Sequence, residues 1–473
     1  YHLFYQPNMS GSYWRNICWG HLVSTDMVNW KPVKEAITPT EDSVVPDGVW
    51  SGGATLDKNG VPLLFFTAGN DAYGKVEGLI SNQNIGVAYP ADLSDPELTD
   101  WVICDELAII QKGGEGRRGE FRDPHIWKEG DIWCMVICTG STSHSTSGSA
   151  ILYTTDRLEL LPDGTIDQNW IYRGPVYEME NQTITYGKTW ELPVILPISN
   201  ESGTITKYVF IFSPAPEDIA DNKIYYFLGY FDLSTGKFTP DESFGGLPRL
   251  MDYGANVFTG PSAFIDPVSG DMVMFSIMQD QRGAGEQGAS GWAHTVGLAR
   301  RVWLNEDGTD VMTAPVEALT SLEEKVLVNE TGLTLEQANE KLSQVSGDML
   351  HIKLTVDVSK ASEFGINMKK GGKLIGRKAD VLHAPALLVI FEDVDRAVVL
   401  RHLLFLDQRT ACQIAQQQAE TVLLRHAFDY ARIDRFLWLG TQRAQDDIIH
   451  AEQVIIQHGH GAFFHQRPEF GAV

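Results

Sequence analysis

The sequence predicts an all-β protein built around a five-bladed β-propeller. Over about the first 320 residues, short apolar and aromatic runs alternate with Gly, Asn, Asp and Pro, which is typical of many short strands. These runs also recur as a unit: a strand that starts with Trp, Arg, Asp or Glu, a strongly apolar strand, and a third strand with small residues. Five such sheet-like units, each of roughly 50–80 residues, predict a propeller with about five blades.

The five units follow one another along the chain. In a propeller the first strand of each blade lines the central channel, so polar groups at the starts of the units should face one shared funnel. The units contain or open at WGHLVSTDMVNW (19–30), the segments 50–101 and 121–160, WELP (190–193) and VFTGPSAF (257–264).

The charge balance excludes several classes of partner. Acidic residues outnumber basic ones 62 to 37, which gives a formal net charge of −25. A field of this sign repels phosphate backbones, so we expect neither nucleic acid nor an anionic membrane as a partner. No apolar run approaches the roughly 18 residues of a membrane helix, so we expect no membrane insertion. A neutral ligand fits this composition.

The cysteines predict neither a disulfide framework nor a zinc site, because they are few, odd in number and lack a CxxC pair. Cys134 and Cys138 share one face of a predicted strand, where we expect both to be buried. The five cysteines are Cys18, Cys104, Cys134, Cys138 and Cys412.

Three domains are predicted. Residues 1–320 form the propeller, with an incomplete first blade, and residues 321–376 form a linker and the start of a β-sandwich, in which HIKLTVDV (351–358) alternates as a strand does. Residues 377–473 form an atypical, helical tail. The whole fold is therefore a five-bladed β-propeller followed by an incomplete β-sandwich and this tail.

The tail differs sharply in composition from the rest of the chain. It holds 7 of the 13 histidines and nine arginines but a single lysine, Lys378. Residues 412–439 have few strand breakers and apolar spacing that favours a helix. Two interpretations stay open: a genuine helical appendage, or a reading-frame error, which the loss of lysine favours. His450, His458, His460 and His465 lack a closing acidic or Cys set, so we expect no metal site there.

The chemistry should lie at the starts of the units. Asp123 and Glu191 open two different units, so they should face one pocket, and two carboxylates beside hydrogen-bonding and aromatic groups suit glycoside hydrolysis. Each also has a structural alternative. An Asp before Pro commonly opens a turn, and a lone Glu is commonly a solvated surface charge. Their matched positions favour the site. The unit starts are Gln6, Trp50–Ser51, Arg122–Asp123 and Trp190–Glu191.

An ordered set of segments resembles glycoside hydrolase family 32, the group of invertases, inulinases and levanases that also includes fructosyltransferases. The resemblance runs from residue 1 to about residue 375. The matching segments are YHLFYQ (1–6), WGHLVSTDMVNW (19–30), WSGGA (50–54), FRDP (121–124), WELP (190–193) and DYGANVFTGPSAF (252–264).

The resemblance implies a role for each matched residue. Glu191 matches the family's general acid/base, and Asp123 matches the carboxylate that stabilises the transition state by binding fructosyl hydroxyls, with Arg122 in support. The reaction it implies is retaining double displacement on terminal β-D-fructofuranosides of the sucrose, inulin or levan type, without metal or organic cofactor. The partner would be a fructose-containing oligosaccharide or polysaccharide.

Four further residues match positions that line the fructosyl subsite in this family. For the two tryptophans among them, a place in the hydrophobic core is an open alternative. The four residues are Gln6, Trp19, Trp50 and Ser51.

The printed chain departs from the family at the nucleophile. In the family the nucleophile is the Asp of a WMNDPNG-type segment, one strand before the match to YHLFYQ. The sequence here opens at YHLFYQ, so we expect an N-terminally truncated chain that lacks normal turnover. Asp47, in PDG, is a possible substitute, but it is more typical of a turn residue.

A second departure follows the acid/base. The family commonly has Cys-Pro-Asp after this Glu, whereas Leu192, Pro193 and Val194 follow Glu191. This leaves hydrolysis and fructosyl transfer both open. A non-catalytic carbohydrate-binding propeller, holding sugars through Trp19, Trp50, Arg122 and Asp123, is a further alternative. N-x-S/T sequons at Asn8, Asn181, Asn200 and Asn329 are compatible with secretion, so an extracellular location is the expectation.

Overall fold

A computed structural model of the chain divides it into two compact units, Tyr1–Val316 and Glu317–Val473. Side chains are described up to residue 355. After residue 356 the description is limited to strand backbones within 363–459. The continuous described ranges are 1–41, 43–70, 81–179, 186–215, 223–252, 258–280, 282–347 and 350–356.

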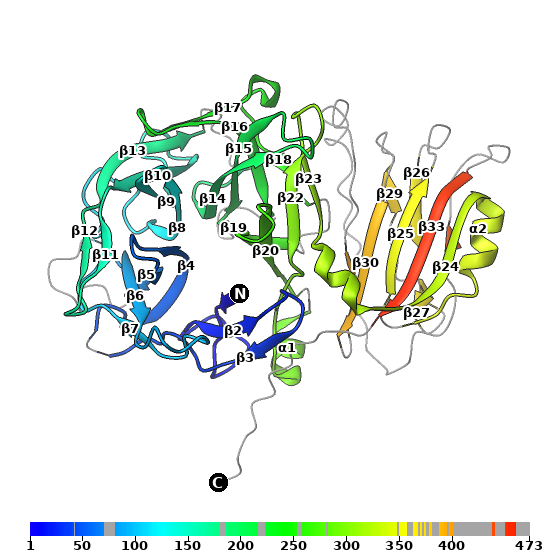
Figure 1. Ribbon diagram of the computed structural model, residues 1–473, viewed down its shortest axis with the longest axis horizontal. Coiled ribbons are helices and arrows are strands. Elements are labelled where there is room, and N and C mark those ends of the chain that lie inside the picture. Colours follow the sequence, from blue (N-terminus) through cyan, green and yellow to red (C-terminus); the bar gives the residue numbers. More distant parts are fainter. Residues whose placement is uncertain are drawn as a thin grey trace, which may run out of the picture. The chain divides into compact units, whose positions relative to one another are not determined.

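The first unit is the predicted five-bladed β-propeller. Five antiparallel sheets follow one another around a ring in the described residues, and strands β4, β8, β14 and β19 lie innermost (Figure 1). Blade 1 consists of β1 (His2–Tyr5), β2 (Gly20–Ser24) and β3 (Trp30–Pro32). Blade 2 consists of β4 (Gly48–Leu56), β5 (Pro62–Gly69), β6 (Gln83–Pro90) and β7 (Trp101–Ile103).

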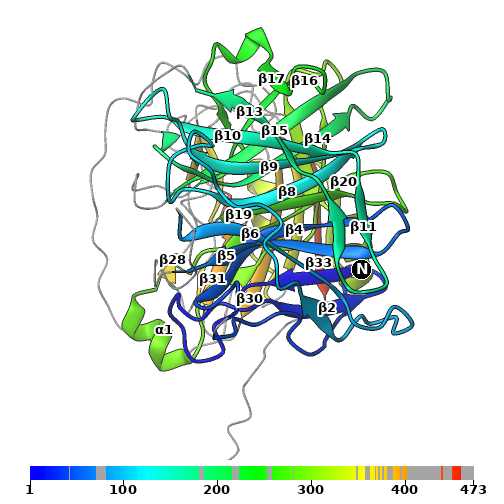
Figure 2. The same cartoon turned by 90° about the vertical axis from the view of Figure 1, so that its left-hand side faces the viewer.

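Blade 3 consists of four strands that follow one another outward from the ring's centre, as a side view also shows (Figure 2). They are β8 (Arg122–Glu129), β9 (Ile132–Gly140), β10 (Gly148–Thr155) and β13 (Ile171–Glu178). A hairpin between β10 and β13 contains β11 (Leu158–Leu160) and β12 (Ile166–Gln168).

Blades 4 and 5 each add a short fifth strand to the same four-strand plan. Blade 4 consists of β14 (Trp190–Ser199), β15 (Thr206–Pro214), β16 (Tyr225–Asp232), β17 (Lys237–Pro240) and β18 (Arg249–Leu250), with the 3-10 helix η2 (Glu242–Phe244). Blade 5 consists of β19 (Phe258–Ile265), β20 (Met272–Met278), β21 (Thr295–Val296), β22 (Arg300–Leu304) and β23 (Val311–Pro315), with helix α1 (Ala284–Ser290).

The middle strands of the blades carry the hydrophobic core. Strands β5 and β9 read as continuous apolar runs because neighbouring blades cover both of their faces, so alternation with polar residues is lost. Phe65 of β5 and Met135 of β9 are fully buried in one cluster that joins blades 2 and 3. Burying each such side chain contributes roughly 1.5–3 kcal/mol. Cys134 and Cys138 of β9 are also fully buried, as the sequence predicts.

The second unit contains a five-stranded antiparallel sheet in the order β24-β33-β25-β30-β31. The strands are β24 (Glu323–Thr334), β25 (Leu350–Val356), β30 (Leu387–Val394), β31 (Ala397–Arg401) and β33 (His450–Gly459). Shorter strands are β26 (Glu363–Asn367), β27 (Lys369–Lys370), β28 (Lys373–Leu374), β29 (Lys378–Asp380) and β32 (Trp438–Leu439). Its helices are η3 (Glu317–Leu322) and α2 (Leu335–Leu342).

The described part of the tail differs from the expected helix. Strands β30, β31 and β33 come from beyond residue 376, yet they share a sheet with β24 and β25, which come from before it. Their runs LLVIFEDV and QVIIQ are rich in Val and Ile, which favour strands. Most of the helix predicted over 412–439 lies outside the described residues, as do His460 and His465.

No helix in the described part of the chain is long and apolar enough to cross a membrane.

Candidate active site

Each of the four innermost strands is interrupted by a bulge near its first residues. The strand register shifts between Trp50 and Gly52 in β4, and at the corresponding place in β8, β14 and β19. In the last three strands, one residue of the bulge has a positive φ angle and a proline follows it. These residues are Asp123 (φ 64°), Leu192 (φ 54°) and Gly260 (φ 58°).

The bulge explains why proline is tolerated there. Proline has no N–H to donate, so it fits a position where the ladder of hydrogen bonds is already broken. A bulge turns the side chains beside it away from the regular alternation of a strand. The polar residues at the unit starts therefore occupy specialised backbone positions on the channel side, and not ordinary strand positions.

Hydroxyl groups link the bulges of successive blades. The hydroxyl of Thr67 on β5 donates to the carbonyl of Ser51 (3.0 Å) and accepts from the backbone N–H of Asp123 (2.8 Å). Ser213 on β15 repeats the second contact, since its hydroxyl accepts from the N–H of Gly260 (3.3 Å). Both hydroxyl side chains are fully buried and lie opposite the first residue of a bulge, so they fix the bulges relative to one another.

Blade 3 departs from this pattern. The residue of β9 that corresponds to Thr67 and Ser213 is Cys138, which lies opposite Arg122. The next bulge N–H, that of Leu192, donates instead to Oδ2 of Asp123 (3.0 Å). A thiol is a weak acceptor, so the carboxylate is the better partner for this N–H. Asp123 is thereby held against the residue that directly follows Glu191.

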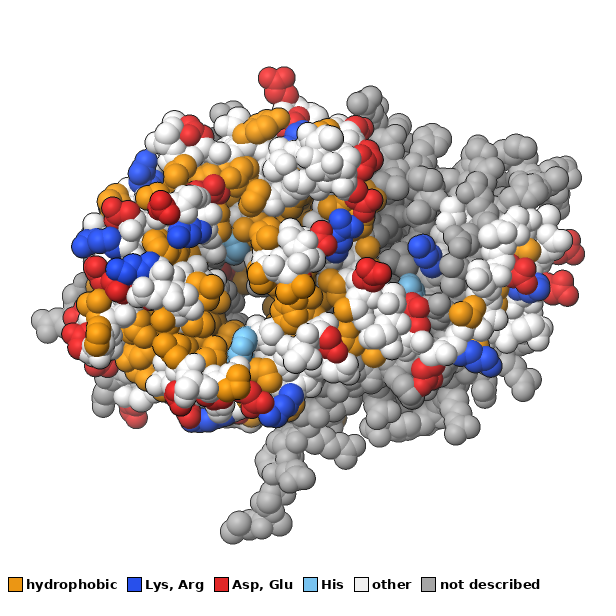
Figure 3. Space-filling model, viewed as in Figure 1, with side chains coloured by type: hydrophobic (Ala, Val, Ile, Leu, Met, Phe, Trp, Pro, Cys, Tyr) orange, Lys and Arg blue, Asp and Glu red, His pale blue; other side chains and the backbone are white. Residues whose placement is uncertain are grey.

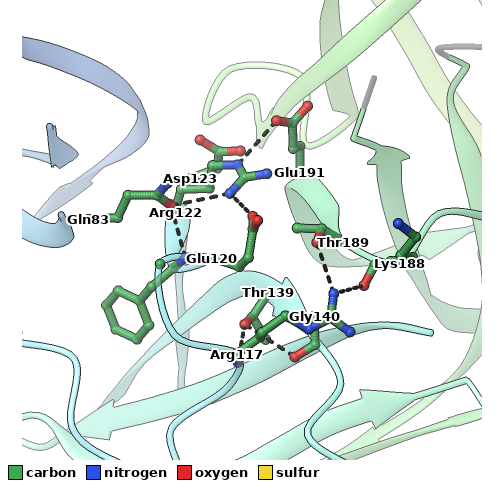
Figure 4. A network of polar contacts seen from close by, with 12 residues as sticks. Gln83, Arg117, Glu120, Arg122, Asp123, Thr139, Gly140, Lys188, Thr189 and Glu191 are labelled. Atoms are coloured by element: carbon green, nitrogen blue, oxygen red, sulfur yellow. Dashed lines mark hydrogen bonds and ion pairs between the residues drawn. The ribbon is translucent and has the colours of Figure 1, made fainter. Parts of the chain in front are cut away.

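The guanidinium of Arg122 links Glu191 to Gln83 and Glu120. Its Nε donates to Oε1 of Glu191 (3.1 Å), and its Nη1 donates to Oε1 of Gln83 (3.2 Å) and to Oε2 of Glu120 (Figure 4). The same Gln83 oxygen accepts from the N–H of Phe121 (3.0 Å). The structure thus brings Arg122, Asp123 and Glu191 together, as the sequence predicts, and surrounds the guanidinium with three acceptors.

The two carboxylates, Asp123 and Glu191, differ in burial and therefore in their electrostatic environment. Asp123 is 5% exposed, and burial raises its pKa to about 6, although Arg122 and the N–H of Leu192 act in the opposite direction. Burial also opposes the charge of Arg122, but Glu191, Asp123 and Glu120 outweigh it and raise the pKa of the guanidinium. The side chain of Glu191 is 21% exposed, so solvent and a ligand can reach it.

A second arginine holds the segment in front of Glu191. Arg117, in the loop between β7 and β8, donates to the carbonyls of Lys188 (3.1 Å) and Ser145 (3.1 Å). Its backbone and side chain pack on Gly140, where an added Cβ would lie 2.3 Å from the guanidinium carbon (Figure 4). Arg117 therefore connects the end of β9 to the start of β14, the strand that carries Glu191.

The four residues predicted to line the fructosyl subsite differ in how accessible they are. Trp19 is 5% exposed, belongs to a core cluster, and donates its indole N–H to the carbonyl of Trp50 (3.0 Å). Trp50 and Ser51 are half-buried at the bulge of β4, and Gln6 is exposed just after β1. Contact of these four residues with a sugar stays a prediction, and for Trp19 the core position leaves little surface for it.

Asp47, the possible substitute nucleophile, lies just before β4. Its backbone N–H donates to the carbonyl of Gly69 (3.3 Å).

The structure adds residues that the sequence did not single out. Trp14, 57% exposed, packs edge-on against Trp50 with ring centroids 5.2 Å apart. Gln83, Glu120 and Thr67 contact Arg122 or Asp123, whereas Arg117 contacts the segment before Glu191. These contacts are formed by folding. The one signal in the sequence was nearness to FRDP, which applies to Glu120 but not to the others.

The site lies in a hollow ring. The space-filling view shows the propeller hollowed at its centre, with hydrophobic side chains gathered around much of the rim (Figure 3). Apolar surface around a few polar groups is the usual make-up of a small-molecule site. No cluster of three or more His, Cys, Asp or Glu suited to a metal ion occurs among the residues that the structure describes.

Comparison with known families identifies the propeller. Residues 1–315 match the family described as "Glycosyl hydrolases family 32 N-terminal domain". The chain belongs to glycoside hydrolase family 32. The match covers the four bulged strands and therefore Arg122, Asp123 and Glu191.

Curated relatives of this family 32 chain include plant proteins that are named as a beta-fructofuranosidase and a fructan exohydrolase. It is 27% identical to "Beta-fructofuranosidase, insoluble isoenzyme 3" of Oryza sativa subsp. indica over 387 residues, which cover 77% of this chain and 61% of that protein. It is 28% identical to "Fructan 1-exohydrolase w3" of Triticum aestivum over 362 residues, 75% of this chain and 54% of that protein. The chain thus spans between about half and three fifths of the length of these relatives.

Solved structures of the family share the fold. Fructan 1-exohydrolase IIa from Cichorium intybus superposes with a TM-score of 0.69 at 16% identity, over 98% of this chain and 93% of that chain. A family 32 beta-fructofuranosidase from Bombyx mori superposes with a TM-score of 0.63 at 17% identity, over 98% and 89% of the two chains.

Proposed function

We propose that the protein hydrolyses terminal β-D-fructofuranosides, of the kind found in sucrose, inulin and levan, by retaining double displacement. The observation that carries the proposal is the coupling of Asp123 to Glu191 through Arg122 and the N–H of Leu192. The names of the relatives support the substrate class. Structures of related proteins are described in complex with 1-kestose, sucrose and fructosylnystose, all of which contain fructose.

Each group has a step in this proposal. Glu191, the exposed carboxyl group, donates a proton to the glycosidic oxygen as the bond to the fructosyl carbon breaks. It then accepts a proton from the water that releases the fructosyl group. Asp123, held in place by two backbone contacts, binds fructosyl hydroxyls and stabilises the positive charge that develops on the ring. Arg122 holds Glu191 by a hydrogen bond and favours the ionised form of Asp123.

The proposal assigns the nucleophile to a segment outside the printed residues. In the described residues, β1 is the edge of a three-stranded blade, whereas the other blades have at least four strands. An added strand that pairs with β1 would lie at the centre of the ring, beside Asp123 and Glu191. A retaining reaction needs a carboxylate about 5–5.5 Å from the acid/base.

The test is an assay of fructose release from sucrose, inulin and levan. Two proteins are compared: residues 1–473, and the same chain extended by its upstream coding sequence. We expect release only by the extended chain, and loss of release in its E191Q variant. E201Q is the matched control, because Glu201 follows the same strand β14 and its side chain is 57% exposed.

The outcomes separate the parts of the proposal. Fructose release by residues 1–473 alone would overturn the assignment of the nucleophile to another segment. No release by the extended chain from any of the three sugars would overturn the hydrolase, and binding of sugar without turnover would favour a carbohydrate-binding propeller.

Fructosyl transfer is the second candidate. It is favoured by the residues after Glu191, since Leu192 and the buried Val194 replace the Cys and Asp that the family commonly has. Water and sugar hydroxyls compete for the same intermediate, so changes near the acid/base alter the outcome. Longer or cyclised sugars among the products would identify transfer, and free fructose alone would identify hydrolysis.

A further inference from the structure

Glu120 is a third carboxylate in the candidate site, and the family resemblance gives it no role. It contacts Nη1 of Arg122, while Nε of the same guanidinium donates to Glu191 (3.1 Å). The side chain of Arg122 is 11% exposed, and those of Glu120 and Glu191 are 33% and 21% exposed. One buried cation therefore bridges two accessible carboxylates.

The contact with Arg122 affects how readily Glu191 can act as a general acid. An arginine beside a carboxyl group favours its ionised form, because opposite charges attract more strongly away from bulk water. A general acid has to hold a proton at the working pH. Taken alone, the contact between Arg122 and Glu191 therefore works against the proposed role of Glu191.

Glu120 is an accessible carboxylate on the other side of the cation that contacts Glu191. In the described part of the chain, the charged or titratable groups near Glu191 include Arg122 and Asp123 of β8 and Cys138 of β9. Strand β19, which also packs against β14, carries no titratable side chain, and Arg300 of β22 is paired with Asp252. Asp123 is buried and fixed, whereas Glu120 holds the other side of the guanidinium.

We propose that Glu120 is a positioning residue that shares Arg122 with Glu191 and so keeps Glu191 able to hold the proton it donates. Gln83 contributes differently. Its side chain is neutral and 7% exposed, and it fixes the guanidinium without altering the charge of the cluster. The inference rests on the proposed function, because it concerns the proton of the same acid.

The pair Glu120 and Gln83 makes the inference testable. In the upstream-extended chain, E120Q removes a negative charge from Arg122, so Arg122 acts more strongly on Glu191. The alkaline limb of the kcat/KM profile, where activity falls as the acid ionises, should move to lower pH by about 0.5–1 unit. Q83M removes a contact of the same guanidinium without changing its charge, so it should lower kcat/KM without moving the limb.

Two controls accompany these variants. E120D restores the charge and should return the limb toward its original pH. E106Q removes an exposed carboxylate from the same loop before β8, away from Arg122, and should leave the profile unchanged.

If the E120Q variant is active and the alkaline limb of its kcat/KM profile coincides with that of the parent, the inference is overturned and the proposed function stays intact. A shift of equal size in Q83M would also overturn it, because the effect would then come from the position of Arg122 and not from charge. Absence of activity in the parent extended chain would count against the proposed function instead.

Discussion

The bulges of β8 and β14 use one backbone arrangement to present two carboxylates in opposite environments. Each has a positive-φ residue followed by proline, yet the acid occupies a different position in each. In β8 the carboxylate is on the positive-φ residue itself, Asp123, and is buried. In β14 it is one residue earlier, on Glu191, and is 21% exposed. A one-residue offset thus separates a fixed, charge-stabilising carboxylate from an accessible one that can exchange protons.

The largest expected effect contrasts the two carboxylates directly. With sucrose, E191Q in the upstream-extended chain should lower kcat by about 10²–10⁴-fold, since proton donation is lost. With an aryl β-fructofuranoside, whose leaving group needs little protonation, the loss of bond-cleavage rate should be much smaller. D123N should slow both substrates by about 10²-fold or more, because its contacts stabilise the ring.

Rates measured for both substrates check this contrast. Equal losses on the two substrates in E191Q would mean that Glu191 does not donate the proton.

The next effect concerns stability. Burial raises the pKa of Asp123 from its ordinary value of 3.8 to about 6. A carboxyl group with a raised folded-state pKa stabilises the fold below about pH 4, and this contribution is lost as the pH rises through about 6. D123N has no such titration. From pH 4 to pH 7 its unfolding free energy should therefore gain about 1–3 kcal/mol relative to the parent.

Urea unfolding of both proteins at several pH values measures this difference. A difference that stays constant with pH would show that Asp123 titrates in the folded protein as it does in the unfolded chain.

A smaller effect tests the link between the bulges. C138S places a hydroxyl where Thr67 and Ser213 have theirs, so it should compete for the N–H of Leu192. Asp123 then loses a donor and should protonate at higher pH. The acidic limb of the kcat/KM profile should move upward, with activity at low pH reduced several-fold.

C134S is the matched control for C138S. Cys134 is fully buried on the same strand but lies opposite Trp127, away from the bulge. Equal behaviour of the two variants would show that the thiol of Cys138 has no special part in the site.

The smallest effect compares the bulged residues themselves. Leu192 has φ 54°, which a side chain tolerates at a cost, so L192G should change stability by no more than about 1 kcal/mol in either direction. G260A should cost about 1–2 kcal/mol, since its Cβ would meet Ile277 at 2.7 Å at φ 58°. Thermal unfolding measures both, and a larger loss in L192G would show that its side-chain packing outweighs the strain.

The sequence predicted the propeller because each blade repeats the same local pattern, and it predicted Arg122, Asp123 and Glu191 because they open such repeats. It did not predict Gln83 or Arg117, whose contacts with the site cross from one blade to another and leave no local pattern. For Trp19 the sequence predicted the segment but did not decide the position of the side chain. Its segment matches the family, but its indole faces the core of the sheet, which alternation alone did not decide.

The tail shows the opposite failure. Apolar spacing over 412–439 favoured a helical tail, yet the described segments at 387–394, 397–401 and 450–459 are strands that pair with one another or with β24 and β25. The overall composition of the tail differs from that of the rest of the chain, but the Val- and Ile-rich runs inside it favour the strands that the structure shows.

The most direct test of the central claim is a crystal structure of the upstream-extended E191Q variant with bound sucrose. The account predicts one fructosyl ring whose hydroxyls lie within hydrogen-bond distance of the Asp123 carboxylate and whose glycosidic oxygen faces residue 191. A sugar bound elsewhere, or one that contacts residue 191 without Asp123, would contradict the claim that the two bulges serve a single site.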